Sequence, residues 1–230
     1  MTEHLAPPYG WLDNESDDYR EARRKLHAAE LELRDQRERV AVLRRQLPSD
    51  TAAEDYVFDE GPLDLDENKP IRQVRLSELT SENRSAVFYQ FMYGAAQKKP
   101  CPMCSMWIDG FHGIARHLRQ TMTFAVVAAA PIEDLRSWGA ERGWHGLRLL
   151  SSAGTNFKKD LRFQQPDGVQ LPGVSIFVRG KDGKPHHFYS VCAVLGKKEY
   201  RGLDLLAPIW NLLDLTPQGR GDWMPPLEYK

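Results

Sequence analysis

Two cysteines separated by two residues carry the first chemical signal in the sequence. They stand in the segment "KKPCPMCSM", residues 98–106, as Cys101 and Cys104. A pair at this spacing suits disulfide exchange, because one thiolate can attack a substrate disulfide and the other can then resolve the mixed disulfide. The same sulfurs suit metal binding, since thiolates are soft ligands. Both chemistries are favoured over two thiols that merely pack as small hydrophobic groups.

The segments on either side of the pair predict a position that stabilises a thiolate. Residues 84–94 have the pattern of a buried strand, and residues 104–120 have the pattern of a helix. The cysteines then lie where a loop enters a helix, and free backbone N–H groups and the helix dipole favour negative charge there. Pro102 stiffens this turn, and the two lysines before the pair add positive potential. Cys101, nearer the loop, is the expected attacking thiol, and Cys104 is the expected resolving thiol.

Strand and helix patterns alternate through the rest of this region. Pro131 starts a helix in "PIEDLRSWGAERG", where proline suits the first turn. The "KDGK" between two apolar runs is the strongest hairpin signal in the chain. The remaining predicted strands are 123–130, 146–152, 173–180 and 184–194, and a last helix lies within 200–223. This order predicts an α/β, thioredoxin-like sandwich, in which helices flank a central mixed sheet.

A long amphipathic helix is predicted ahead of the α/β region. Between Asp17 and Leu47, apolar or small residues recur at alternating steps of four and three, which is a heptad pattern. The seam consists of Ala22, Leu26, Ala29, Leu33, Gln36, Val40, Leu43 and Leu47. Ser16 or Asp17 can cap the start of the helix, and Pro48 stops it.

Such a seam has to be covered by other apolar surface. We expect an arm, residues 1–48, followed by a thioredoxin-like domain, residues 49–230, with 48–70 as a connector. The seam either docks on the chain's own domain or pairs with a second copy, and a homodimer through this helix is the expected assembly.

Composition and charge narrow the classes of partner. The chain has 230 residues, 41% of them hydrophobic, and its 31 basic and 32 acidic residues leave a net charge of -1. No global positive field favours nucleic acid. The first residues lack a basic segment followed by an apolar one, and no run of about 18 apolar residues occurs, so we expect no membrane partner and a cytoplasmic location. Three cysteines are unlike a secreted disulfide framework.

Six segments together resemble one known family. They are "CPMCSMWIDGF", "AAAPIEDLRSWGAERGW", "SSAGTNF", "LPGVSIFVR", "HHFYS" and "LDLTPQGR". In order along most of the chain, they resemble the thioredoxin-like domain family of unknown function numbered 899 (DUF899). The resemblance implies a thioredoxin- or peroxiredoxin-type fold with an added amino-terminal helix, and it places the family's CPxC pair on Cys101 and Cys104. It implies no established reaction.

Thioredoxin-like folds imply further site residues. Pro172 stands just ahead of a strand, where such folds carry a cis proline that abuts the dithiol. Trp107 is the aromatic residue that limits solvent access to the sulfur, and Tyr189 is retained from the family's hairpin, so both are expected to contact substrate. The chain departs from the family at Cys192, where an aromatic residue is customary, and in "GTNFKKDL", which stands for the acidic "GSDFNYDF".

The leading hypothesis is a thiol–disulfide oxidoreductase that acts on a small oxidised molecule or a protein thiol and requires no cofactor. A peroxiredoxin-like variant is the nearest alternative, with Cys104 as the peroxide-reducing thiol of a P-T-x-x-C motif. Cys101 then occupies the threonine position and removes the hydroxyl that would bind peroxide, so exchange ranks higher. Asp109 is a candidate proton acceptor during exchange.

Two other classes of function stay open. A Cu(I)-binding protein would use Cys101, Cys104 and His187, because soft thiolates with an imidazole suit Cu(I). Alternation along the strand places His187 and Tyr189 on one face and Cys192 on the other, which argues against a site shared by His187 and Cys192. A non-catalytic scaffold that assembles through the amino-terminal helix is the third reading.

Overall fold

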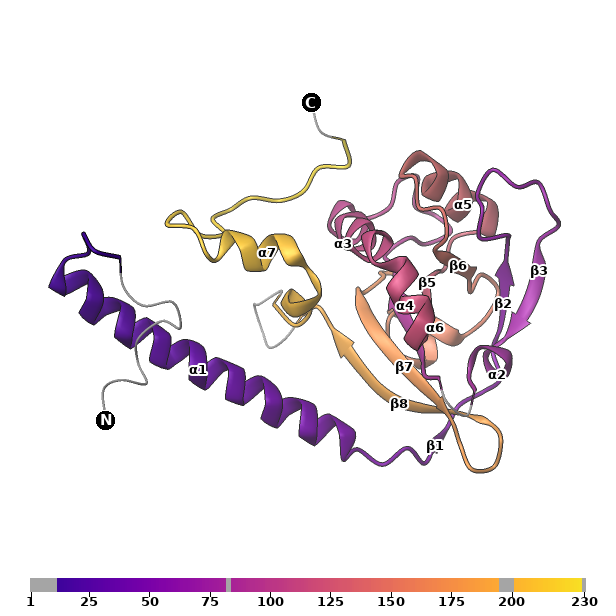
Figure 1. Cartoon of the computed structure of the whole chain (residues 1–230). Coiled ribbons are helices and arrows are strands. Elements are labelled where there is room, and N and C mark those ends of the chain that lie inside the picture. Colours follow the sequence, from indigo (N-terminus) through magenta and orange to yellow (C-terminus); the bar gives the residue numbers. More distant parts are fainter. Residues whose placement is uncertain (1–11, 82–83, 195–200, 229–230) are drawn as a thin grey trace. The chain divides into compact units, whose positions relative to one another are not determined.

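The computed structural model describes residues 12–81, 84–194 and 201–228. These residues belong to two units, Met1–Leu47 and Pro48–Lys230. The first unit holds the long helix, and the second holds the sheet and the remaining helices (Figure 1).

The long helix of the first unit is α1 (Asp17–Arg45). The Ser16 side chain caps it by accepting a hydrogen bond from the backbone N–H of Tyr19 at 3.2 Å. Acidic residues occupy its first turn and arginines its last turn, as the helix dipole favours. The helix ends two residues before the predicted end. No residue of α1 is buried in the structure.

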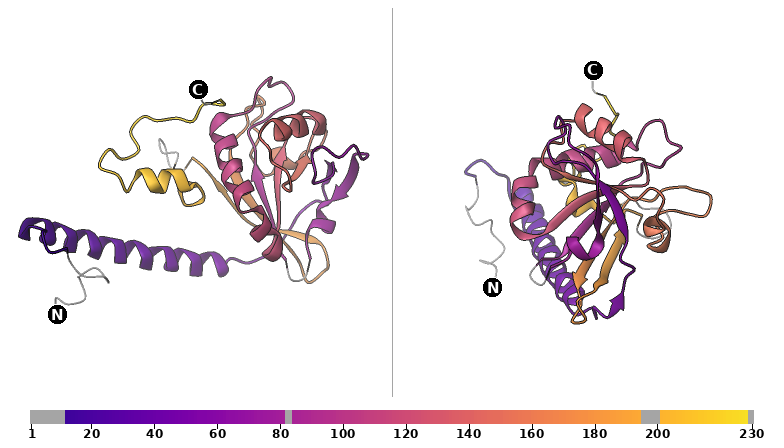
Figure 2. Two further views of the ribbon diagram at one scale, coloured as in Figure 1. Left: turned by 45° about the horizontal axis from the view of Figure 1, so that its top comes forward. Right: turned by 90° about the vertical axis from the view of Figure 1, so that its right-hand side faces the viewer.

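One mixed sheet of eight strands forms the centre of the second unit, among the residues that the structure describes. Its strand order is β1-β8-β7-β4-β5-β6-β2-β3, and the sheet is curled (Figure 2). The strands are β1 (Thr51–Ala52), β2 (Val57–Glu60), β3 (Arg72–Arg75), β4 (Ala86–Gln90), β5 (Thr123–Ala128), β6 (Arg148–Ser151), β7 (Gly173–Arg179) and β8 (Pro185–Cys192). β4, β5 and β6 are parallel, and the other neighbours pair antiparallel. The carboxyl ends of the parallel strands therefore share one edge, which is where ligands bind in many α/β folds.

Short helices flank this sheet. They are α2 (Leu76–Leu79), α3 (Pro102–Gly113), α4 (Ala115–Thr121), α5 (Ile132–Glu141), α6 (Phe157–Asp160) and α7 (Pro208–Leu213), with a 3-10 turn η2 (Asp204–Leu206). The predicted helix 104–120 is divided into α3 and α4, because Ile114 leaves the helical region with ψ of 9°.

Two buried clusters lie on opposite faces of the sheet. Neighbouring residues of β4 show the division, since Phe88 belongs to one cluster and Tyr89 to the other. We call the cluster with Tyr89 and Cys104 the dithiol-side cluster, and α3 and α5 contribute to it. The other is the aromatic cluster, which α2 and α6 complete. The aromatic cluster comprises Tyr56, Phe58, Val74, Leu76, Leu79, Ala86, Phe88, Ala125, Val127, Leu150, Phe157 and Phe177.

The prediction that residues 48–70 form only a connector is wrong. They contain β1 and β2, and β2 pairs with both β3 and β6. Phe58 of β2 is fully buried in the aromatic cluster. Glu60 is also buried, and it forms ion pairs with Arg72 at 2.6 Å and with Arg148 at 2.6 Å. Two-residue and four-residue strands are too short to show a periodic pattern, so only their sheet partners define them.

The fold class is the predicted one: a thioredoxin-like α/β sandwich with a central mixed sheet, flanking helices and an added amino-terminal helix. None of the described helices combines the length and apolar character that crossing a membrane would require.

Candidate active site

The backbone of Cys101 is fixed at the entrance to α3. Cys101 is the N-cap residue, in an extended conformation, and Pro102 occupies the first turn of the helix. The Cys101 N–H donates to the Met92 carbonyl at 3.1 Å. Its own carbonyl accepts from the backbone N–H and from the hydroxyl of Ser105, each at 3.1 Å. The predicted strand–loop–helix setting of the dithiol is therefore present.

Hydrogen bonds from the α3 entrance lower the pKa of Cys101 to about 6. The largest contribution is a hydrogen bond from the Cys104 thiol, and backbone N–H groups of Cys104 and Met103 add to it. Burial opposes the shift without cancelling it. The Cys101 side chain is partly exposed. At neutral pH this sulfur is mainly a thiolate that a substrate can reach.

Cys104 has the opposite properties. It is 1% exposed, and burial raises its pKa, with the hydrogen bond to Cys101 and the charge on that sulfur adding to the effect. The Met92 N–H and the Tyr89 hydroxyl act in the other direction as donors to its sulfur. The Tyr89 hydroxyl is buried, and among the described residues it has no hydrogen-bond partner at ordinary hydrogen-bond geometry. A reachable thiolate beside a buried thiol is the arrangement that attack followed by resolution requires.

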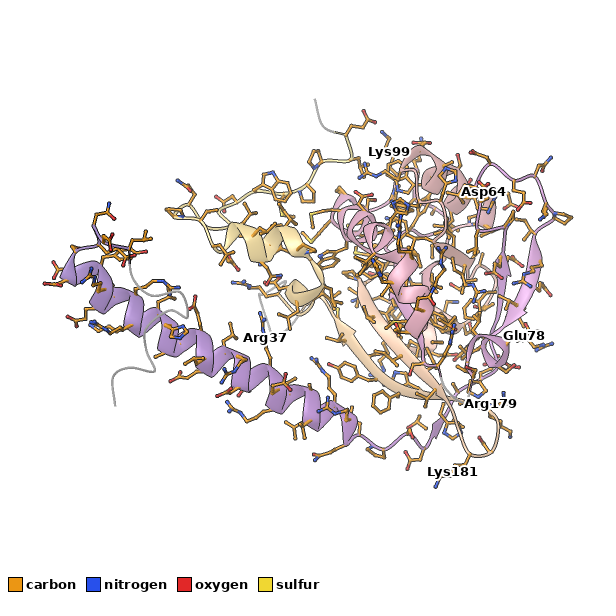
Figure 3. All side chains as sticks on the ribbon, in the orientation of Figure 1. Arg37, Asp64, Glu78, Lys99, Arg179 and Lys181 are labelled. Atoms are coloured by element: carbon orange, nitrogen blue, oxygen red, sulfur yellow. The ribbon has the colours of Figure 1, made fainter. Side chains whose placement is uncertain are left out.

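Lys98 and Lys99 do not account for the thiolate. Both are exposed on the loop that precedes α3, and Lys99 is labelled in Figure 3. The groups that lower the pKa of Cys101 all lie within the turn from Cys101 to Cys104. The start of α3 therefore stabilises the Cys101 thiolate, and the contribution predicted for the two lysines is absent.

Pro172 lies at the expected edge of the sheet but in the other isomer. Gly173 pairs with Gln90, which places Pro172 beside the carboxyl end of β4, from which the dithiol loop departs. No cis peptide bond occurs among the described residues, so the prediction of a cis proline is wrong. The Pro172 carbonyl, just ahead of β7, accepts from the Ala193 N–H at 3.0 Å.

His187 lies on the face of the sheet opposite the dithiol. Its ring packs edge-on against Phe177 of the aromatic cluster at a centroid distance of 5.5 Å. Burial lowers its pKa, and its Nε2 is 2.8 Å from the hydroxyl of Ser190. The sheet therefore separates this imidazole from the Cys101 and Cys104 sulfurs, and the predicted Cu(I) ligand set is not brought together.

A β-bulge explains why strand alternation misplaced His187. Tyr189 pairs with Ile176 and His187 pairs with Phe177, so Phe188 is an extra residue on β8. His187 consequently shares a face with Ser190, which was predicted to point the other way. Tyr189 stays on the dithiol face, because its partner Ile176 packs against the dithiol-side cluster.

The two predicted substrate contacts differ in accessibility. Trp107 is 1% exposed and packs edge-on against Tyr89 at 6.0 Å. It is part of the core, as the apolar inward face predicted for residues 104–120 also indicated, and it is not available as the substrate contact that the thioredoxin-like resemblance implied. Its position three residues after Cys104 turns it to the inward face of α3. Tyr189 is half-buried and retains exposed surface.

Asp109 is occupied by a structural ion pair. It pairs with the Arg142 guanidinium and accepts a hydrogen bond from Trp144 Nε1 at 2.8 Å. Arg142 also donates to the Leu227 carbonyl at 2.8 Å. This carboxylate ties α3 to α5 and to the chain's carboxyl end, rather than serving as the predicted proton acceptor. Cys192 is a free, partly exposed thiol on β8, opposite Gly173.

Sequence reasoning missed Lys158, the most unusual charged residue near the site. It lies in α6, is 1% exposed, and donates from Nζ to the Phe91 carbonyl at 2.6 Å. Burial lowers its pKa to about 7, while the negative charge of a Cys104 thiolate would raise it. The next residue, Lys159, is exposed. Nothing in "FKKD" distinguishes the two lysines before the chain folds.

Two other features near the sheet edge do not contain the sulfurs. A pocket of about 420 Å³ is lined by the loop after β4 and by residues after β5 and β6, including Gly94 and Ser152. Asp64, Asp66 and His145 form an exposed group on connecting loops, and Asp64 is labelled in Figure 3. Among the described residues this is the one group of three side chains spaced for a metal ion. It shares no residue with the predicted copper site.

Solved structures that resemble this chain are peroxiredoxins. The reduced 2-Cys peroxiredoxin of Plasmodium vivax is 12% identical with a TM-score of 0.47, covering 70% of this chain and 95% of that one. AhpC of Enterococcus faecalis is 10% identical with a TM-score of 0.48, covering 76% and 96%. The mitochondrial 2-Cys peroxiredoxin of Plasmodium falciparum is 15% identical with a TM-score of 0.47, covering 72% and 94%. Identities this low carry no information about activity.

Sequence comparison identifies a family. The family described as "Bacterial protein of unknown function (DUF899)" matches residues 12–229, which is nearly the whole chain. No curated protein matches the sequence.

Proposed function

The chain belongs to the DUF899 family, and we propose that it is a thiol–disulfide oxidoreductase in which Cys101 attacks and Cys104 resolves. The observation that carries the proposal is the asymmetry of the pair. Hydrogen bonds at the start of α3 lower the pKa of Cys101 to about 6, whereas burial raises the pKa of Cys104. At neutral pH Cys101 is therefore mainly a thiolate, while Cys104 is a protonated thiol.

The proposed reaction balances as a two-electron transfer. The Cys101 thiolate attacks one sulfur of the substrate disulfide and forms a mixed disulfide, while the other half of the substrate leaves as a thiolate. Cys104 then loses its proton and attacks the sulfur of Cys101. The second half of the substrate leaves and takes up that proton. The substrate is reduced to two thiols, the protein is oxidised to the Cys101–Cys104 disulfide, and an external dithiol restores the reduced protein.

The test uses 5,5′-dithiobis(2-nitrobenzoate), an aromatic disulfide that releases one coloured thiolate on attack and a second on resolution. We expect the dithiol of the reduced protein to release two equivalents in two phases, beside one equivalent from the free thiol Cys192. Cys101→Ser should reduce the first phase to the rate of the uncatalysed reagent, because a hydroxyl does not ionise near neutral pH. Cys192→Ser is the control that keeps both phases, after correction for one free thiol. A Cys101→Ser variant that still releases two equivalents rapidly would remove the proposal.

The reactivity of the pair favours exchange over a peroxiredoxin-like reaction. A peroxiredoxin-like reading requires Cys104 to meet peroxide as a thiolate, yet Cys104 is 1% exposed and its pKa is raised. We expect hydrogen peroxide to be consumed slowly and through Cys101. Peroxide consumption that survives Cys101→Ser and disappears in Cys104→Ser would reverse the ranking.

We propose a small disulfide or a protein disulfide as the substrate and the reducing cytoplasm as the location of the reaction. Partly exposed Tyr189, on the same face of the sheet as the dithiol, is the proposed substrate contact. Replacing Tyr189 by alanine should raise KM for a protein disulfide more than it lowers kcat. An unchanged KM would remove this assignment.

The amino-terminal arm, residues 1–48, is the proposed dimerisation element. The leucines of its seam are exposed, with Leu33 at 54% and Leu43 at 62%. A heptad seam matches a second copy of the same helix. Leu33→Lys should convert a two-chain mass, measured by light scattering, to a one-chain mass. Glu38→Gln, which makes the same change in charge away from the seam, should leave the mass unchanged; equal masses for wild type and Leu33→Lys would exclude this interface.

A further inference from the structure

Lys158 is a buried basic residue with no role in the exchange steps of Cys101 and Cys104. It is 1% exposed, and its ammonium has one hydrogen-bond acceptor among the described residues, the Phe91 carbonyl. No carboxylate pairs with it in the part of the chain that the structure describes. A buried ammonium without an anionic partner costs stability. A negative charge that appears near this position would therefore stabilise the ammonium.

One peptide group joins Lys158 to the resolving cysteine. The Phe91 carbonyl accepts from Lys158 Nζ at 2.6 Å, and the N–H of the same peptide, that of Met92, lowers the pKa of the Cys104 thiol as a donor. The Met92 carbonyl accepts from the Cys101 N–H at 3.1 Å, so this stretch of backbone lies against the dithiol turn. A cation bound to the carbonyl of a peptide polarises its N–H and strengthens the hydrogen bond that the N–H donates. The ammonium and the sulfur thus lie at the two ends of one polarised unit.

We propose that Lys158 supplies the positive charge that allows Cys104 to ionise for the resolution step, acting through the Phe91–Met92 peptide. This inference rests on the proposed exchange function. In the step itself the Cys104–H bond breaks, a Cys104–Cys101 disulfide forms, and the bond between Cys101 and the substrate sulfur breaks. The substrate thiolate leaves, and the proton is released to it or to water. Lys158 is a positioning residue that touches neither substrate nor the disulfide.

The timing of the charge follows from the groups that face Cys104. In the reduced protein the Cys101 thiolate opposes ionisation of Cys104. Formation of the mixed disulfide removes that charge, so the repulsion disappears when resolution is needed. The Tyr89 hydroxyl also faces the sulfur as a neutral donor, and burial raises its own pKa. Tyr93, whose ring packs on Phe91, also has a raised pKa and is therefore neutral near pH 7. Of the three side chains named here, Tyr89, Tyr93 and Lys158, only Lys158 can carry a positive charge.

A coupled lysine gives resolution a distinctive pH dependence. Burial lowers the pKa of Lys158 to about 7. Above that pH, a neutral thiol with a neutral amine contains as many protons as a thiolate with an ammonium, so further alkali does not increase the fraction of reactive thiolate. Below it, the thiolate requires the loss of one proton. The resolution rate should therefore rise about tenfold per pH unit below pH 7 and level off above it.

The experiment measures the second phase of coloured thiolate release from 5,5′-dithiobis(2-nitrobenzoate) between pH 5.5 and 9. The wild-type profile should bend near pH 7. In Lys158→Met, resolution should be at least about tenfold slower at pH 7, and its rate should keep rising through pH 9, because Cys104 then titrates alone. Lys158→Gln retains a donor for the Phe91 carbonyl but no charge, and it should behave like the methionine variant. Lys159→Met, one residue away and exposed, is the control with the wild-type profile.

The outcomes separate this inference from the proposed function. A bend near pH 7 that persists in Lys158→Gln would show that the amine's charge has no part in resolution and would overturn the inference. Loss of the bend in Lys158→Gln, with a first phase like that of wild type, would support it. Failure of the exchange proposal appears instead as a missing first phase in the wild-type protein. If Lys158→Met does not fold, the glutamine variant alone decides.

Discussion

The buried polar groups on the two faces of the sheet differ in how completely they are hydrogen-bonded. On the face of the aromatic cluster, Gln90 Nε2 donates to the Ser175 hydroxyl at 3.2 Å, and Ser190 donates to the same hydroxyl at 2.9 Å. His187 extends the chain at 2.8 Å from Ser190. On the dithiol side, three buried ionisable groups have few partners: Cys104, the Tyr89 hydroxyl and, at the sheet edge, Lys158.

The difference indicates which face holds structure and which can change charge. A chain of hydrogen bonds between neutral side chains links β4, β7 and β8. Each of its polar atoms has a hydrogen-bond partner except the side-chain oxygen of Gln90, Oε1. Around Cys104, burial shifts the pKa of each ionisable group, because water has been removed and no full set of partners replaces it. Groups in that condition respond strongly to a nearby change of charge.

The largest effect is expected from removing the resolving thiol. In a protein that also carries Cys192→Ser, Cys104→Ser should release one equivalent of coloured thiolate and stop at a stable mixed disulfide on Cys101, because no second thiol is left to resolve it. Mass spectrometry of the product should show one added 2-nitro-5-thiobenzoate group. In the variant that retains Cys192, release of two equivalents with no group left on the product would assign resolution to Cys192 and break the contrast between the two faces.

The pH dependence of the first phase reports the pKa of Cys101, which is lowered to about 6. The attack rate should be level above pH 7 and should fall about tenfold per pH unit below pH 6, as the thiolate takes up a proton. Cys104→Ser keeps a hydroxyl donor to Cys101, whereas Cys104→Ala removes it. The midpoint should therefore move to higher pH in the alanine variant, and equal midpoints in the two variants would show that this donor is unimportant.

Lys158→Met should stabilise the protein, by about 1–4 kcal/mol at pH 7, since an uncompensated buried charge is replaced by an apolar chain. The pKa of Lys158 is lowered to about 7 in the folded chain from an ordinary value of 10.5. Between these values the unfolded chain binds more protons, so wild-type stability rises with pH through this window. The advantage of the variant should shrink from pH 7 to pH 10 in urea unfolding. A constant difference would mean that folding does not shift the pKa of Lys158.

The smallest effect is expected on the opposite face. Ser175→Ala removes the shared hydroxyl between Gln90 and Ser190 and should cost about 1 kcal/mol of stability. Both phases of thiolate release should keep their rates and pH profiles, because the sheet separates this chain from the sulfurs. A changed second phase in Ser175→Ala would show that the two faces are coupled.

Sequence reasoning was most successful where structure is local. Ser16, the acidic first turn and the heptad spacing together specify α1. Pro102 and the strand pattern before it specify that Cys101 stands at a helix entrance. Each of these signals acts over a few neighbouring residues, so no distant partner is needed to interpret it.

Sequence reasoning failed where a residue's role depends on a distant segment. Alternation along β8 was misleading because the bulge at Phe188 turns His187 to the other face. The thioredoxin-like pattern suggested a cis bond at Pro172, whereas the bond is trans. β1 and β2 were missed since each is defined by the strand that it pairs with.

The sequence by itself therefore determined the order of the strands from β4 to β8, the long capped helix and the position of two thiols at the start of α3. Only the tertiary structure decided which thiol is buried, which of two adjacent lysines loses its contact with water, and on which side of the sheet an imidazole lies. Order and caps follow from interactions between near neighbours in the chain. The burial of a residue and the face of the sheet on which it lies depend on the strand register and on the loops that cover the strand ends. Register and loop packing are set by residues that are far apart in the sequence.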